Sequence, residues 1–363
     1  MTAPGGTDLR SCLVVGTGLI GTSVALALRR SGVSVHLRDR DPLAVRRAAD
    51  LGAGEPSEPQ GRVDVAVVAV SPSATARVVT DLLDGGVAAT VMDTAGVKAE
   101  IVDDVRRLSS APSRFVGTHP MAGRERSGPG AARADLFEGR PWVVESGAEP
   151  PARRQAEALV ALCGGVPVAM SADEHDVAVA LVSHVPQVAA TLVAARLADG
   201  RADALALAGQ GVRDVTRVAA SDADLWVDVL VANAEPVARL LTDLGADLDA
   251  AVTALHALAA DPGGSRRALR DLLVRGNAGR ARLPGKHGAP PTPYVVVPVV
   301  VADRPGELAR LLADAGAAGV NVEDIRIEHS PGQPVGLVEL SVSPGVDEQL
   351  TAALTGLGWV VHR

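Results

Sequence analysis

The stretch LVVGTGLIG, residues 13–21, carries a GxGxxG pattern between an apolar run and a predicted helix. Gly16 permits a tight turn after the strand, Gly18 lets backbone approach a pyrophosphate, and Gly21 lets the helix pack closely on the strand. The diphosphate would lie at the helix N-terminus, beside Leu19 and Ile20, where free N–H groups and the helix dipole favour negative charge. The pattern predicts a dinucleotide site, and a glycine turn without a nucleotide is the alternative.

An acidic residue follows the glycine motif at the spacing of a nicotinamide dinucleotide site. Asp39 ends the second predicted strand, and its carboxylate can accept both ribose hydroxyls of NAD while repelling the 2′-phosphate of NADP. Arg38 and Arg40 flank it and weaken this discrimination. Ser71, just beyond the third predicted strand, is a further cofactor-binding candidate. The predicted cofactor is NAD.

Outward from this motif, apolar runs alternate with helical patterns over residues 10–160. The early runs are nearly continuous in Val, Leu and Ala, which is typical of parallel strands covered on both faces. This alternation predicts a Rossmann-type doubly wound α/β sheet in a domain over residues 1–168. The predicted strands are Ser11–Val15, Val33–Leu37, Val63–Val70, Ala88–Asp93, Phe115–Thr118 and Trp142–Glu145.

Residues 169–262 are predicted to form an all-helical domain. Ser171 and Glu174 form a capping box at the start of a helix that Pro186 is expected to kink. Further helices are predicted over 202–220 and 223–260, with a break at Pro236. Helices this apolar bury most of their surface, so we expect this domain to supply the interface of a homodimer.

The C-terminal part begins with a linker over residues 263–292, which contains a short basic helix. Residues 293–363 then show a βαββαβ order, as in ferredoxin-like domains. Its predicted elements are the strand Tyr294–Val301, the helix Glu307–Ala318, the strands Val320–Glu328 and Gly336–Val342, the helix Asp347–Leu357 and the strand Trp359–His362.

Composition excludes several classes of function. The 363 residues are 47% hydrophobic and 21% charged, as in ordinary globular proteins, and a net charge of −8 without basic runs argues against nucleic acid or an anionic membrane. Only Cys12 and Cys163 occur, both in apolar stretches. With a polar N-terminus, no metal-ligand cluster and no uninterrupted apolar segment long enough to span a bilayer, we expect a soluble cytoplasmic protein.

The segment GTHPMAGRERSG, residues 117–128, carries the candidate catalytic residue. His119 ends a predicted strand, where ligands of open α/β sheets lie, and Pro120 keeps it extended. A histidine there can take a hydroxyl proton near neutral pH. A structural histidine is the alternative.

Four motifs in order, VVGTGLIGTS, GTHPMAGRERSG, EHDVAVALVSHVPQ and GVRDVTRVAASDADLW, resemble the prephenate/arogenate dehydrogenase family and span residues 14–226. The C-terminal unit, with DRPGEL at 303–308 and GVNV at 319–322, resembles an ACT domain. The resemblance implies NAD-dependent oxidative decarboxylation of prephenate to 4-hydroxyphenylpyruvate, with His119 as the base that takes the C4 hydroxyl proton.

The resemblance also implies substrate contacts. Arg217 matches the family's substrate-binding arginine, whose planar fork suits a carboxylate. Arg213 and Glu125 match positions implicated in gating the pocket, and Arg124 is a further candidate. A solvated or Asp-paired surface residue is the alternative for Arg213. His175 and His184 are nine residues apart, half a turn out of phase on an α-helix, so only one is expected to face the substrate. We assign His184 to the pocket and expect His175 to bond backbone or a neighbouring domain.

Two departures from the family's pattern affect the substrate. The motif DTAGVK at 93–98 has Gly96 where the family often carries a serine that bonds the catalytic histidine and the substrate hydroxyl. Gln187 stands where some members have histidine. Arogenate and 4-amino-4-deoxyprephenate therefore remain alternative substrates.

The last predictions concern regulation and other classes of protein. ACT domains bind amino acids, so an aromatic amino-acid effector is expected at Asp303, Pro305, Gly306, Glu307, Leu308 and Asn321; a purely structural domain is the alternative. A 3-hydroxyacid dehydrogenase would need a lysine in the helical domain, and the chain has only Lys98 and Lys286. A non-catalytic NAD- and amino-acid-sensing regulator would need neither His119 nor Arg217.

Overall fold

The computed structural model describes residues 9–123, 128–284, 294–329 and 334–362. The chain divides into two compact units, Met1–Asp249 and Ala250–Arg363. Each unit is described by itself.

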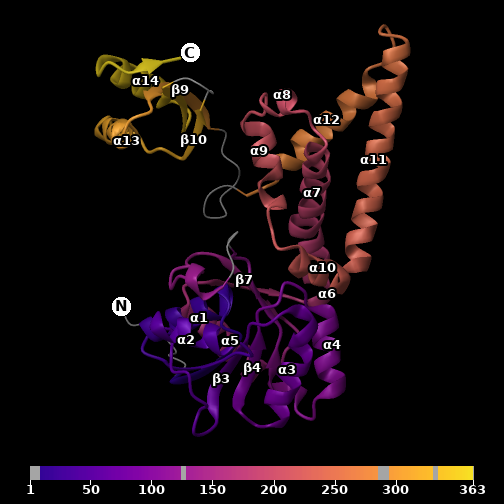
Figure 1. The fold of residues 1–363 in the computed structure, drawn as a ribbon, viewed down its shortest axis with the longest axis vertical. Coiled ribbons are helices and arrows are strands. Elements are labelled where there is room, and N and C mark those ends of the chain that lie inside the picture. The colour runs from indigo at the N-terminus through magenta and orange to yellow at the C-terminus, as the bar shows by residue number, and fades with distance from the viewer. Residues whose placement is uncertain (1–8, 124–127, 285–293, 330–333, 363) are drawn as a thin grey trace. The chain divides into compact units, whose positions relative to one another are not determined.

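The first unit contains a five-stranded parallel sheet with the order β2-β1-β3-β4-β5 (Figure 1). The order reverses between β1 and β3, as in doubly wound sheets. The prediction of a Rossmann-type sheet is confirmed. The strands are β1 (Ser11–Val15), β2 (Ser34–Arg38), β3 (Val63–Val68), β4 (Ala88–Asp93) and β5 (Phe115–Val116).

Helices cover both faces of this sheet, which explains why its strands are apolar throughout. On β1, Cys12 and Val14 enter one core cluster, whereas Leu13 and Val15 enter the other. The first cluster lies under α1 (Leu19–Arg30), α2 (Pro42–Asp50) and α5 (Pro150–Leu162), and the second under α3 (Pro72–Asp84) and α4 (Ala99–Leu108).

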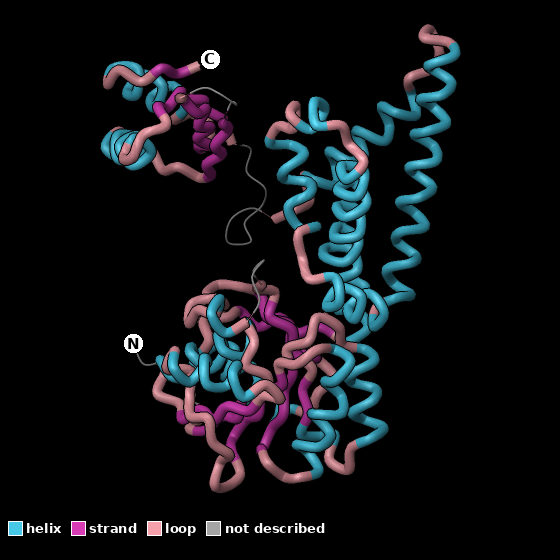
Figure 2. Tube along the Cα trace, viewed as in Figure 1, coloured by secondary structure: helices cyan, strands magenta, loops and turns pink. Residues whose placement is uncertain are grey.

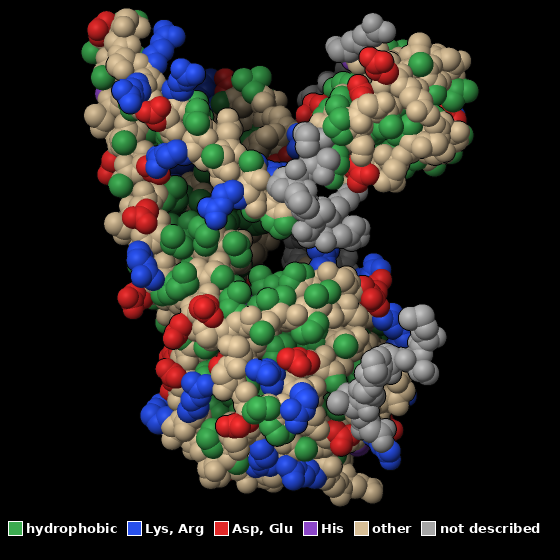
Figure 3. Space-filling model, turned by 180° about the vertical axis from the view of Figure 1, so that it is seen from behind, with side chains coloured by type: hydrophobic (Ala, Val, Ile, Leu, Met, Phe, Trp, Pro, Cys, Tyr) green, Lys and Arg blue, Asp and Glu red, His purple; other side chains and the backbone are tan. Residues whose placement is uncertain are grey.

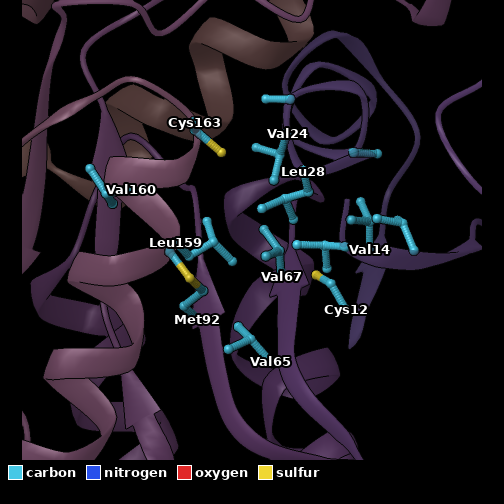
Figure 4. Close-up of a cluster of buried hydrophobic side chains, with 14 of the residues drawn as sticks. Cys12, Val14, Val24, Leu28, Val65, Val67, Met92, Leu159, Val160 and Cys163 are labelled. Atoms are coloured by element: carbon cyan, nitrogen blue, oxygen red, sulfur yellow. The ribbon is translucent and has the colours of Figure 1, made fainter. Parts of the chain in front are cut away.

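Figure 4 shows the first cluster, in which the side chains of α1, α5 and the strands meet. Cys12 and Cys163 are both fully buried free thiols there. Burial raises the pKa of Cys163 to about 12, so neither thiol is placed for nucleophilic chemistry.

A second, three-stranded sheet of order β6-β7-β8 carries the predicted catalytic histidine. It consists of β6 (Thr118–Pro120), β7 (Pro141–Glu145) and β8 (Val166–Met170). The predicted strand over 115–118 is thus divided between two sheets. Gly117 joins the halves, where a Cβ would lie 3.1 Å from Val102 Cγ2. The sequence analysis missed β8, whose exposed Val166 and adjacent proline hide the strand pattern.

A long helix begins at Ser171 with the predicted capping box, both of whose hydrogen bonds are present. It runs as α6 (Ala172–Val179), a π-helical turn (Ala180–His184) and α7 (Val185–Ala198) (Figure 2). Pro186 has no N–H for the carbonyl four residues earlier, and the helix widens just before it instead of showing a simple kink.

This continuous helix, residues 172–198, is long and apolar enough to cross a membrane by length and composition. Its apolar residues are interrupted by Ser183, His184 and Gln187, so it is not the uninterrupted apolar segment that the sequence analysis considered. The same helix buries the polar side chains of His175, Asp176 and His184 inside the first unit. Most of its apolar side chains are not buried in the single chain, and Leu181, Val182 and Leu192 are exposed.

The remaining helices follow the prediction in outline. The expected break at Pro236 lies three residues earlier, at Asn233, because proline fits the first turn of a new helix. The elements are α8 (Ala202–Leu205), α9 (Gln210–Thr216), a 3₁₀ turn (Arg217–Ala219), α10 (Ala223–Ala232) and α11 (Ala234–Ala260).

The second unit contains the predicted basic helix α12 (Arg267–Arg280) and an antiparallel sheet of order β10-β11-β9-β12. This order and the element sequence confirm the βαββαβ prediction. Two helices pack on one face of the sheet, around Leu311, Leu340 and Leu350. The elements are β9 (Val295–Ala302), α13 (Glu307–Ala317), β10 (Asp324–His329), β11 (Val335–Val342), α14 (Asp347–Gly356) and β12 (Val360–Val361).

Candidate functional site

The glycine loop between β1 and α1 has the geometry that the sequence predicts. Gly16 has φ +98°, and a Cβ there would lie 2.3 Å from the carbonyl oxygen of Ala69. A Cβ on Gly21 would lie 1.9 Å from the carbonyl oxygen of Gly16, so only glycine allows this helix–turn contact. Gly18 faces open space, and no side chain caps the helix start. A diphosphate fits this open helix N-terminus.

Asp39 lies beside the same loop. Its Oδ2 accepts hydrogen bonds from the Thr17 N–H (2.6 Å) and hydroxyl (3.0 Å), and its Oδ1 accepts one from the Asp41 N–H (2.9 Å). A carboxylate has about four acceptor positions, so these bonds leave about one for a ribose hydroxyl. Contact with both hydroxyls, as the sequence analysis expected, would require a protein bond to give way.

The neighbouring arginine is engaged elsewhere. Arg38 Nε donates to Glu58 Oε1 at 2.8 Å, with a second contact to Oε2, and this pairing lowers the pKa of Glu58. The charge of Arg38 is therefore partly neutralised. Arg38 consequently weakens the discrimination of Asp39 against NADP less than the sequence suggests. Ser71 is exposed at the start of α3, beyond β3, with its hydroxyl 3.3 Å from that of Ser73.

His119 lies on β6 as the first member of a chain of side chains. Its Nδ1 is 2.8 Å from Nε2 of His175, and the two rings are nearly perpendicular with centroids 5.1 Å apart. Nδ1 of His175 is 2.7 Å from Oδ1 of Asp176. His175 and Asp176 are buried, whereas His119 is partly exposed.

Burial is the main cause that holds the pKa of His119 well below 6.5, and repulsion from His175, Lys98 and His184 adds to it. The ring is therefore neutral at neutral pH and can accept a proton. Gly96 faces its other edge: a Cβ on Gly96 would lie 3.8 Å from Nε2 of His119. No side chain at position 96 covers the nitrogen that would act as the base.

A buried ion pair lies next to the strand that carries His119. Lys98 Nζ contacts Asp93 Oδ2, and both side chains are at most 1% exposed. Asp93 also accepts the N–H of Thr118 and of Ala95, each at 3.0 Å. Trp142 Nε1 donates to the Thr118 hydroxyl at 3.0 Å. These bonds fix the residue that precedes His119.

Asp176 ties the long helix to the nucleotide-binding part. Its Oδ1 accepts the N–H of Lys98 and its Oδ2 that of Ala99, each at 2.8 Å. Helix α4 begins there without a side-chain cap from Lys98, its own N-cap residue. A carboxylate at a helix N-terminus is favoured by the helix dipole, so Asp176 acts as a cap supplied by another helix.

The structure corrects the phase argument about His175 and His184. One α-helical residue turns by about 100°, and the π-turn over 180–184 inserts about one extra residue, which reduces their angular separation to roughly 80°. Asn233 Nδ2 lies 2.8 Å from the Asp176 carbonyl oxygen and 3.0 Å from Nδ1 of His184. His184 is buried edge-on against Trp226, and burial lowers its pKa.

The other predicted substrate contacts are placed as follows. Arg213 on α9 and Arg217 in the following 3₁₀ turn are exposed, and Asp214 accepts a hydrogen bond from Gln210 at 2.8 Å. Gln187 is buried and donates to the Ser221 hydroxyl at 2.8 Å. Arg124 and Glu125 lie outside the described residues.

Sequence reasoning underrated His175. It expected a bond to backbone or a neighbouring domain; the bond does reach the neighbouring domain, and its partner there is His119. Asp176 and Asn233 were missed. The adjacent His175-Asp176 pair in the EHD motif was the available signal.

Comparisons with known proteins agree with this geometry. Residues 24–168 match the family model "Prephenate dehydrogenase, nucleotide-binding domain", and residues 171–267 match "Prephenate dehydrogenase, dimerization domain". A Streptomyces niveus protein named "Probable prephenate dehydrogenase NovF" is 42% identical over 361 residues, which cover 97% of this chain and 99% of that protein. The chain belongs to the prephenate dehydrogenase family.

Other members of the prephenate dehydrogenase family support the assignment. The cyclohexadienyl dehydrogenase of Zymomonas mobilis is 31% identical over 69% of this chain and 89% of its own length. The crystal structure of the A. aeolicus prephenate dehydrogenase, in complex with hydroxyphenyl propionate and NAD+, matches with a TM-score of 0.64 at 26% identity and covers 76% of this chain and 99% of that one. This family member is accordingly an NAD-dependent oxidoreductase, as the sequence predicted.

Proposed function

We propose that this enzyme oxidises prephenate with NAD and releases its ring carboxylate as CO2, giving 4-hydroxyphenylpyruvate. The observation that carries the proposal is the place of His119: it lies on β6, next in the chain after the parallel strand β5, with Nε2 facing Gly96, and burial holds its pKa well below 6.5. The full-length likeness to NovF and the ligands of the A. aeolicus structure support the same substrate class.

In this reaction His119 takes the proton of the C4 hydroxyl. Bound NAD supplies the acceptor for the C4 hydride. Loss of CO2 returns the electrons of the broken bond to the ring, which becomes aromatic, and His119 gives its proton to the phenolate oxygen. General-base catalysis of this kind contributes about 10²- to 10⁴-fold in rate.

The residues proposed around these atoms keep their predicted roles. Arg217 binds a substrate carboxylate through its planar fork. His184, Arg213, Arg124 and Glu125 are further substrate contacts, and the NAD contacts are Gly16, Gly18, Leu19, Ile20, Gly21, Asp39 and Ser71.

Gly96 keeps 4-amino-4-deoxyprephenate and arogenate as second candidates. A serine fits at position 96, since its Cβ would make an ordinary contact 3.8 Å from Nε2 of His119. Its hydroxyl could then hydrogen-bond the ring or the C4 substituent of the substrate.

The substrate test measures kcat/KM for prephenate, arogenate and 4-amino-4-deoxyprephenate with the wild type, Gly96→Ser and Gly96→Ala. We expect prephenate to be the best substrate of the wild type. Gly96→Ser should change the ratio of hydroxyl to amino substrate by about 3- to 10-fold, the effect of one hydrogen bond, and Gly96→Ala should not. Preference of the wild type for either alternative would reassign the substrate.

A homodimer through the helical domain is proposed from its surface. Figure 3 shows hydrophobic side chains gathered on the helices, and several are more than half exposed. These include Leu181, Val182, Leu192 and Val231. The family model for this segment is a dimerization domain. Sedimentation velocity should show a dimer, and a monomer at micromolar concentration would refute it.

The C-terminal βαββαβ unit is proposed to be an ACT-like effector domain. Asp303, Pro305, Gly306, Glu307 and Leu308 lie at the start of α13, whereas Asn321 follows the end of this 11-residue helix, which is about 16 Å long. One copy therefore does not bring them together, and an effector site would require a second copy. Kinetics with Tyr, Phe and Trp test this; a flat response to all three would refute it.

We also propose that the enzyme is soluble and cytoplasmic, because its two cysteines are buried free thiols, as is usual in a reducing compartment. Cell fractionation with immunodetection checks this, and recovery in the membrane fraction would contradict it.

A further inference from the structure

Three side chains of the site form one hydrogen-bonded chain from a fixed carboxylate to the base. Asp176 Oδ1 is 2.7 Å from Nδ1 of His175, and Nε2 of His175 is 2.8 Å from Nδ1 of His119. Asp176 also accepts the N–H groups of Lys98 and Ala99. Two backbone N–H groups thus donate to this carboxylate, one to each oxygen.

The hydrogen-bonded series Asp176–His175–His119 determines which ring nitrogen carries each proton. A carboxylate cannot donate, so Nδ1 of His175 donates to Asp176. When His175 is neutral, its single N–H is the one directed to Asp176, so its Nε2 accepts. The remaining contact then requires Nδ1 of His119 to donate. Nε2 of His119, the nitrogen that faces Gly96, is left as a bare lone pair.

We propose that His175 and Asp176 are positioning residues that hold neutral His119 with its proton on Nδ1, so that Nε2 serves as the base. This inference deepens the proposed function and rests on it for the role of Nε2. The two residues begin the long helical segment, whereas His119 belongs to the nucleotide-binding part. The base is therefore set only when α6 packs against the start of α4.

The direct test is the tautomer itself. The chain has eight histidines, few enough for ¹⁵N NMR of the ring nitrogens, with the His119→Asn variant identifying the signals of His119. We expect the wild type to show a protonated Nδ1 and a bare Nε2. In His175→Leu, which removes the acceptor, both tautomers should be populated. A wild-type His119 protonated on Nε2, or an unchanged tautomer in His175→Leu, would overturn the inference.

Kinetics of two matched variants separate positioning from structural support. Glutamine at position 175 can present a carbonyl oxygen near the place of Nε2, whereas leucine cannot accept a hydrogen bond. We expect His175→Leu to lower kcat by about 10²-fold with KM for NAD nearly unchanged, and His175→Gln to recover most of the loss. Equal losses in both variants, matched by equal losses of thermal stability, would assign His175 a merely structural role.

The two tests fail independently. If the wild type does not oxidise prephenate, the proposed function falls, but the NMR result still decides the tautomer. If prephenate is oxidised while His119 carries its proton on Nε2, the positioning role falls and the function stands.

Discussion

Replacement of His119 by asparagine is expected to lower kcat by about 10²- to 10⁴-fold while leaving the protein folded and able to bind NAD. The asparagine amide reaches only the place of Nδ1, so it can keep the bond to His175 but offers no atom at Nε2. Steady-state NADH formation gives kcat, and calorimetric titration gives the affinity for NAD. His256→Asn, an exposed histidine on α11, is the matched control.

The pH dependence belongs to the same prediction. The pKa of His119 is held well below 6.5, so the base stays unprotonated as the pH falls through 6.5. The acidic limb of kcat/KM should therefore lie below pH 6.5. The same shift adds stability that is present above the unfolded pKa and lost as the pH falls toward the folded one.

An asparagine variant with more than a tenth of wild-type activity would exclude His119 as the base.

The second large effect concerns stability. Asp93→Asn should lower the free energy of unfolding by about 3–5 kcal/mol, because it leaves Lys98 buried without its counter-charge. Desolvation already lowers the pKa of Lys98, and attraction from Asp93 opposes that effect. Urea unfolding followed by circular dichroism measures the change.

Two control variants distinguish the loss of a buried counter-charge from the loss of any ion pair. Asp135→Asn breaks the exposed ion pair with Arg133 and is expected to change stability little. The double variant Asp93→Asn/Lys98→Met removes both buried charges and should recover a substantial part of the loss. If Asp93→Asn is no more destabilising than Asp135→Asn, the buried pair between Asp93 and Lys98 does not stabilise the protein.

The parts of the fold that the sequence predicted correctly depend on local patterns. The glycine loop at Gly16 is recognised in the sequence by its GxGxxG spacing. The buried strands are recognised because both sheet faces are covered, which makes the strands continuously apolar. The capping box at Ser171 is equally local. Strand β8 was missed because Val166 is exposed and Pro167 suggests a loop, although pairing with β7 determines its structure.

The parts of the site that the sequence did not predict depend on packing between distant segments. The bond between His119 and His175 joins residues 56 apart and requires α6 to dock on the nucleotide-binding part. The π-turn before Pro186 changes the phase of the helix, which a constant period of 3.6 residues cannot reveal. By contrast, His119 itself could be found from its motif, although the structure places it in the middle of β6 and not at a strand end.

The most direct test of the central claim is the stoichiometry of one reaction: prephenate and NAD with the wild type and with His119→Asn. The account predicts equal amounts of NADH, CO2 and 4-hydroxyphenylpyruvate from the wild type, and almost none from the variant. Wild-type enzyme that binds NAD but forms no NADH from prephenate, or a variant that forms all three products at the wild-type rate, would contradict it.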